Sequence, residues 1–115
     1  MNEYMELLSR LQTVLPSENV SDTLNQETTI EGVTILKLRD AFLTIGEILE
    51  EDLENRVYIA SVKTGFWNLG CAYIAAQLKD KQIFTSIYSH EGLIKQQLSS
   101  RAYQKLINTL KRNTI

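Results

Sequence analysis

Apolar residues recur every three or four positions along much of the chain, which places them on one face of an α-helix. This pattern predicts a first helix over residues 2–15. It is ended by Pro16, which has no amide hydrogen and clashes with the preceding turn. A final helix is predicted over residues 90–112, where apolar residues follow one another every four positions: Ile94, Leu98, Ala102, Leu106 and Leu110. Both helices have polar residues on the opposite side, so each is expected to bury one face.

The middle of the chain has a denser apolar pattern. Thr28 and Glu31 have the spacing of a helix-capping box, which predicts a second helix that starts directly after Thr28. A third helix, predicted over residues 53–79, is apolar on nearly every side and is therefore expected to be the most buried element. We expect a turn within residues 49–55. Residues 16–28, rich in Ser, Asn, Asp and Thr, are expected to form a loop.

These elements predict an all-α fold, an antiparallel bundle of about four helices with the third helix buried at its centre. The whole chain, residues 1–115, is expected to form a single helical domain, since its length is typical of one domain. An α+β fold with two short strands is the alternative. Residues 29–36 are rich in β-branched side chains, and residues 82–88 suit a strand as well as a helical turn.

Residues 66–73 resemble the first helix of a tetratricopeptide repeat, in which an aromatic residue, a Leu-Gly pair and a tyrosine occur at this spacing. No second copy follows at the length of one repeat, about 34 residues. We therefore interpret the segment as close packing between helices, for which small residues such as Gly65 and Gly70 leave room.

Charge is distributed unevenly along the chain, although the net charge is only −2. Residues 1–55 contain twelve acids and three bases, a net charge of −9. Residues 56–115 contain two acids and nine bases, a net charge of +7, and no acid follows Glu91. The simplest interpretation is that bases of the final helix complement the acids of the first two helices. An external acidic partner is the other interpretation.

The sequence contains no recognisable catalytic or metal-binding motif. His90 is the one histidine, which excludes sites that need two or three histidines from the same chain. Cys71 has apolar neighbours and no base beside it in sequence to activate the thiol. The acids between Glu47 and Glu54 lack the alternating spacing and central glycine of an EF-hand loop. We therefore expect no enzyme activity, no cofactor and no bound metal.

The final helix provides the clearest candidate for partner binding. Arg101, Lys105 and Arg112 fall on one strip of this helix, beside its apolar face. A basic amphipathic helix of this kind binds acidic proteins, nucleic acids or anionic membranes. Trp67, an aromatic residue on the predicted third helix, is the candidate for a second contact with the partner.

The expected function is therefore that of a small interaction protein that presents a helical surface to a protein partner or to a second copy of itself. An adaptor, a chaperone-like subunit and a regulatory or immunity-type binder all fit this description. A nucleic-acid-binding regulator that uses the same bases together with Lys111 is the first alternative. An enzyme whose site forms across a dimer interface is the second.

The sequence also predicts a cytoplasmic protein without a membrane span. The N-terminus carries acid where a secretory signal has basic residues, and the single cysteine cannot form an internal disulfide. The longest apolar run, residues 57–78, contains Lys63, and a charge at the centre of a bilayer costs about 2.5–3.5 kcal/mol. A buried core segment is therefore the better interpretation of that run.

Overall fold

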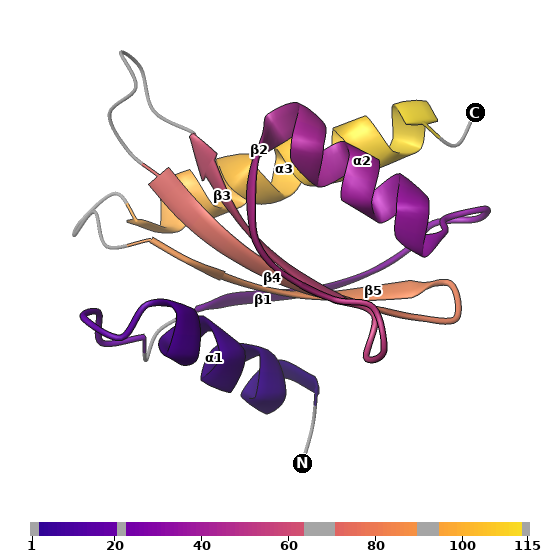
Figure 1. Ribbon diagram of the computed structural model, residues 1–115. Helices are drawn as coiled ribbons and strands as arrows, with labels where there is room; N and C mark the ends of the chain where they lie inside the picture. Colours follow the sequence, from indigo (N-terminus) through magenta and orange to yellow (C-terminus); the bar gives the residue numbers. More distant parts are fainter. Residues whose placement is uncertain (1–2, 21–22, 64–70, 90–94, 114–115) are drawn as a thin grey trace.

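One five-stranded sheet organises the protein in the computed structural model, which describes residues 3–20, 23–63, 71–89 and 95–113 (Figure 1). These residues form, in chain order, α1 (Glu3–Val14), β1 (Leu24–Thr29), α2 (Ile35–Ile45), β2 (Gly46–Asp52), β3 (Val57–Lys63), β4 (Cys71–Lys79), β5 (Gln82–Tyr88) and α3 (Lys95–Asn113). The strand order is β1-β5-β4-β3-β2, and every neighbouring pair is antiparallel.

Four strands form a meander, and the first strand lies at the far edge. The strands β2, β3, β4 and β5 each pair with the next one along the chain, whereas β1 pairs with β5. The pairing of β2 with β3 shifts register between Ile48 and Glu50, which leaves Leu49 without an opposite residue. Such a bulge bends an edge strand and disfavours pairing with another strand.

Helices cover both faces of the sheet (Figure 1). On one face, α1 packs against β4 and β5. On the other face, α2 lies over β2 and β3, while α3 lies over β4, β5 and β1 and packs against α2. The sheet therefore separates two apolar cores, a larger one beneath α2 and α3 and a smaller one beneath α1.

The predicted all-α bundle is wrong, because the segment assigned to its buried third helix, residues 53–79, contains β3 and β4. Residues 57–60 at the start of β3 are all buried, since helices cover both faces of the sheet. A strand buried on both faces gives a continuous apolar run without alternation, which has no period that distinguishes it from a buried helix. The resemblance to a tetratricopeptide helix is wrong over residues 71–73, because these residues form part of a strand. The other residues of that resemblance, 66–70, lie outside the described part of the chain.

The second helix starts later than predicted. Thr34 caps the N-terminus of α2, because its hydroxyl accepts a hydrogen bond from the Lys37 backbone N–H at 3.2 Å. Thr28, the residue predicted to cap it, lies in β1 instead. The only large apolar residue of β1 is Leu24, so the strand carries no hydrophobic alternation that would have distinguished it from a loop.

The α+β alternative is nearer to the structure but incomplete. β5 occupies Gln82–Tyr88, one of the two segments that the alternative assigns to a strand. The other, residues 29–36, holds the end of β1, a turn and the start of α2. The turn contains Gly32, whose φ of +79° is a backbone conformation that favours glycine.

The two terminal helices agree with the hydrophobic pattern. α1 buries Leu7 and Leu11 against the sheet, and α3 buries Leu106 and Leu110 on the other side. Each helix exposes polar residues on its outer surface, so the helical period stays visible in the sequence. In the part of the chain that the structure describes, no helix combines the length and the apolar character that a membrane crossing requires.

Ion pairs attach α1 to the sheet. Arg10 donates to Asp52 of β2 at 3.0 Å and to Glu6 at 3.2 Å. At the start of the helix, Lys79 of β4 donates to Glu3 at 3.0 Å. The Asp52 carboxylate also accepts hydrogen bonds from the side chain and backbone of Asn55, so it holds the turn after β2 as well as the helix.

We expect acid to weaken this attachment. Hydrogen bonds from Asn55, and then the Arg10 guanidinium, lower the pKa of Asp52 below its usual 3.8. A carboxyl group whose pKa is lower in the folded protein stabilises it above the unfolded pKa, and this stability is lost as the pH falls through the folded pKa. As the pH is lowered below about 5, the urea concentration at the unfolding midpoint should therefore decrease. The difference in this midpoint between the wild type and Asp52→Asn should become smaller over the same pH range. Parallel pH profiles for the two proteins would contradict this assignment.

Candidate partner-binding groove

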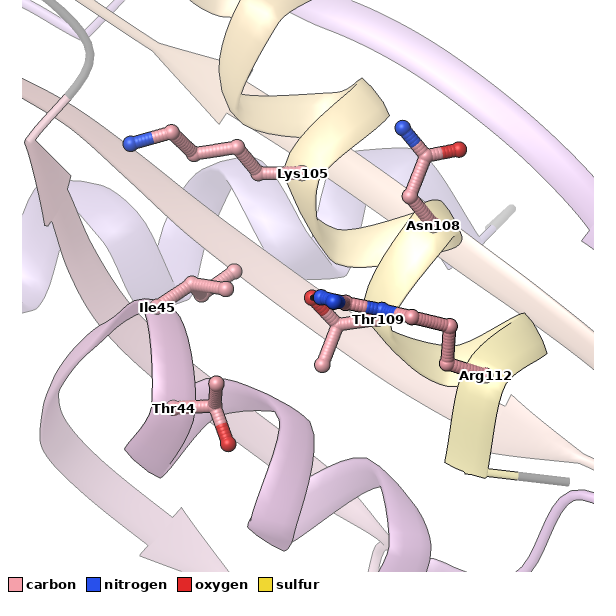
Figure 2. Close-up of a pocket in the computed structure, with 6 residues that line it drawn as sticks. All are labelled: Thr44, Ile45, Lys105, Asn108, Thr109 and Arg112. Carbon is pink, nitrogen blue, oxygen red and sulfur yellow. Dashed lines mark hydrogen bonds between the residues drawn. The ribbon is translucent and has the colours of Figure 1, made fainter.

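A surface hollow of about 320 Å³ lies between the C-terminal turn of α2 and the outward side of α3 (Figure 2). We call it the α2–α3 groove, and its lining residues are Thr44, Ile45, Lys105, Asn108, Thr109 and Arg112. Figure 2 shows the Arg112 side chain folded back over Thr109, with its guanidinium directed toward α2. The groove thus combines cationic, amide and hydroxyl groups with one aliphatic side chain.

A second hollow of about 390 Å³ continues from the same turn toward the edge of the sheet. It shares Thr44 and Ile45 with the α2–α3 groove and is further lined by Gly46, Glu47, Ser61 and Lys63. The adjoining hollow therefore carries one acid, Glu47, and one base, Lys63.

The shape of this region depends on how α2 ends. Gly46 closes the helix, since its backbone N–H bonds the Phe42 carbonyl, and it also begins β2. A Cβ atom at Gly46 would overlap the Ser61 carbonyl group, 2.9 Å from its carbon. The missing side chain therefore allows α2 to pass into the sheet without a connecting loop.

The packing of α3 fixes which of its residues face the groove. Ala102, Leu106 and Leu110 are completely buried against the sheet, and Thr109 is 3% exposed at the contact with α2. Lys105 and Arg112 occupy the exposed side of the helix, where their charges remain hydrated. They also lie beside the C-terminus of α2, the negative end of its dipole, so part of their charge stabilises the fold.

The two bases of the groove form hydrogen bonds with neutral oxygen atoms of the described residues. Lys105 donates to the Lys63 carbonyl at 2.7 Å, and Arg112 donates to the Thr109 hydroxyl at 3.4 Å. Among the residues that the structure describes, neither base lies within ion-pair distance of a carboxylate. By contrast, Arg10, Arg39, Lys79 and Lys81 each form an ion pair with a carboxylate. Within the described residues, internal charge complementarity therefore does not account for these two bases.

The structure brings together two of the four residues predicted to bind a partner. Lys105 and Arg112 line the same groove, and Arg101 is exposed one helical turn before Lys105. Trp67 lies outside the described residues. Thr44, Ile45 and Lys63 were not predicted as neighbours of these bases, because nothing in a single sequence indicates that α2 and β3 meet α3.

Protein-family models, curated proteins and solved structures were compared with the chain, and none matches it. Function is therefore inferred from the geometry of the groove alone.

The chemistry of the groove is that of anion binding. An ammonium, a guanidinium and an amide group supply hydrogen-bond donors, and charged donors bind carboxylates and phosphates most strongly. The described residues contain no group of three or more His, Cys, Asp and Glu side chains arranged to hold a metal ion. Cys71 is half-buried at the start of β4 and does not line the groove, while His90 lies outside the described residues.

Proposed function

We propose that the protein is a non-enzymatic binding protein that holds a short acidic segment of a partner protein in the α2–α3 groove. The observation that carries this proposal is that Lys105 and Arg112 line one hollow without a carboxylate at ion-pair distance in the described residues. Thr44 and Asn108 add hydrogen-bonding groups, and Ile45 offers an apolar contact. A cytoplasmic location belongs to the same proposal, since its single cysteine suits a reducing compartment.

The limited extent of the basic surface favours a short segment. Glu47 and Lys63 both line the adjoining hollow, and the acids that follow in β2 include Glu51 and Asp52, which pair with Arg39 and Arg10. A long polyanion that followed the groove beyond α2 would leave Lys105 and Arg112 for a surface that carries acids as well as bases, and would gain little further binding free energy there. An acidic peptide of a few residues makes the favourable contacts and ends before it reaches β2.

Nucleic acid is the second candidate, because Arg101, Lys105 and Arg112 recur along one exposed strip of α3. Such a strip contacts successive phosphates, and its affinity falls steeply with salt concentration. The two candidates therefore differ in the length of ligand that they prefer and in the contribution of Ile45.

Charge reversal in the groove is expected to weaken peptide binding strongly. A charged hydrogen bond contributes about 1.5–3 kcal/mol, so Lys105→Glu and Arg112→Glu should each reduce affinity about tenfold or more. Fluorescence anisotropy with a labelled peptide of glutamates and one leucine measures this change. Lys81→Glu, the same charge change in the β4–β5 hairpin, should leave the affinity nearly unchanged.

An oligothymidylate of the same length is the second probe. If it binds more tightly than the peptide and its affinity rises with each added nucleotide, nucleic acid replaces protein as the ligand. If neither charge reversal changes peptide affinity relative to Lys81→Glu, the groove is not the binding site.

A further inference from the structure

The hollow beside the α2–α3 groove carries two opposite charges. We call it the α2–β2 hollow, and its lining residues are Thr44, Ile45, Gly46, Glu47, Ser61 and Lys63. Thr44 and Ile45 line it from the last turn of α2 (Figure 2), and the other residues belong to β2 and β3. Its volume of about 390 Å³ is within the range of pockets that hold small molecules. Neither Lys105 nor Arg112 lines it, so its chemistry is separate from that of the groove.

The strand register places the two charged side chains on one face of the sheet. Along β3, Ile59 belongs to the core beneath α1, so alternation puts Ser61 and Lys63 on that same face. Glu47 is paired directly with Ser61, and the side chains of directly opposite residues share a face. The helix on this face, α1, packs against β4 and β5, while Glu47 and Lys63 are exposed and Ser61 is half-buried.

The two charges do not neutralise each other. Glu47 and Lys63 are diagonal neighbours on paired strands, and such residues lie about 7–8 Å apart. Within the described residues, neither side chain forms an ion pair with the other or with a third residue. A ligand that contacts both charges therefore has no ion pair to break.

We propose that the α2–β2 hollow binds a free α-amino acid with an aliphatic side chain. The Lys63 ammonium donates to the carboxylate of the ligand, and the Glu47 carboxylate accepts hydrogen bonds from its ammonium group. Hydrogen bonds between charged groups are the strong ones. The Ser61 hydroxyl lies on the same face as both charges, and Ile45 offers an apolar contact to the ligand side chain. The inference goes beyond the proposed function, because it uses neither base of the groove.

The pair of charges selects a free amino acid over related molecules. An amine without a carboxylate meets the like charge of Lys63, and a carboxylate without an ammonium group meets the like charge of Glu47. Unfavourable contacts of this kind discriminate between ligands as effectively as favourable ones. A peptide carries its two terminal charges on different residues, so no single residue of it satisfies both side chains.

A titration with L-leucine tests the proposed site. Because the hollow is open and the ligand is small, we expect a dissociation constant in the millimolar range. Two-dimensional amide NMR should show saturable shift changes that are largest at residues 45–47 and 61–63. Isoamylamine, which is leucine without its carboxylate, and isocaproate, which is leucine without its ammonium group, should each bind at least about tenfold more weakly.

Exchange of the two charges separates ligand binding from a structural effect. Glu47→Lys and Lys63→Glu should each weaken leucine binding about tenfold or more. The double variant, with both substitutions, again has one acid and one base, and the ligand can bind in the reverse orientation. It should therefore bind leucine more tightly than either single variant, whereas two independent structural defects would add. The NMR spectrum of each variant shows whether it is folded.

Two control variants distinguish the hollow from the groove. Arg112→Glu should weaken binding of the acidic peptide but leave leucine affinity nearly unchanged, because Arg112 does not line the hollow. Lys81→Glu, in the β4–β5 hairpin, should change neither. If Arg112→Glu weakens leucine binding as strongly as Lys63→Glu does, the amino acid occupies the groove and the inference is wrong.

Three further results would overturn the inference. Leucine that causes no saturable shift changes excludes the site, and peptide binding to the groove would be unaffected by that result. Isoamylamine or isocaproate binding as tightly as leucine shows that the hollow does not recognise both charges. A double variant that binds leucine no better than either single variant shows that Glu47 and Lys63 do not act on the same ligand.

Discussion

Replacing Gly46 with alanine is expected to destabilise the protein by about 3 kcal/mol or more, a large part of the stability of a small domain. The cause is lack of space, because the new methyl group would overlap the Ser61 carbonyl of the paired strand. A flexible side chain could rotate away, but a strand backbone moves only if its pairing is disturbed. The backbone at Gly46 has a φ of −171°, which is ordinary extended geometry, so conformational strain plays no part.

Gly32 provides the matched control for this substitution. A Cβ atom at Gly32 would have no neighbour within 4 Å, but its φ of +79° disfavours other residues. Gly32→Ala should therefore cost about 1–2 kcal/mol, and Gly32→Asn less, since asparagine tolerates positive φ. At Gly46, asparagine should be at least as damaging as alanine. Urea unfolding followed by circular dichroism measures all four variants, and a Gly46→Ala protein as stable as the wild type would contradict this account.

The second large effect is expected from Phe42→Ala. Phe42 is completely buried in the core beneath α2, and its ring centroid lies 6.2 Å from that of Tyr58. Truncation of a buried phenylalanine removes its apolar contacts and leaves a cavity, at a cost of about 3–5 kcal/mol. The same unfolding experiment measures the loss.

Leu43→Ala is the control for this position. It removes a similar amount of apolar side chain from the next residue of α2, but Leu43 is 51% exposed. Its effect should be within about 0.5 kcal/mol when unfolding is measured at a concentration where the protein is monomeric. If Phe42→Ala and Leu43→Ala lowered the free energy of unfolding equally, α2 would have to face the core with a different side.

The hydrophobic pattern predicts those elements that bury one face, and fails for those that bury two. The terminal helices show the helical period because one side of each meets water. Residues 57–60 of β3 have no exposed side, and the alanines of β4, Ala72, Ala75 and Ala76, favour a helix by intrinsic propensity. In the structure these small residues let helices approach both faces of the sheet.

Only the α3 side of the candidate site could be predicted from the sequence. Lys105 and Arg112 are close in sequence, and their helical spacing places them on one strip of α3. Their neighbours in the groove come from the end of α2, about sixty residues earlier, and that proximity depends on the sheet topology. The apolar pattern of α2 was ambiguous for a related reason: Leu36 and Leu43 widen it although both are exposed, and a single sequence does not show which apolar side of a helix meets the core.

The strand order has a consequence for the assembly of the chain. β2, β3, β4 and β5 join through connections between sequence neighbours, whereas β1 can pair only after β5 has been made. Although β1 precedes the other strands in the chain, it is therefore the last to pair. α1 cannot pack earlier either, because it packs against β4 and β5. During synthesis, α1 and β1 therefore leave the ribosome before the strands that will hold them.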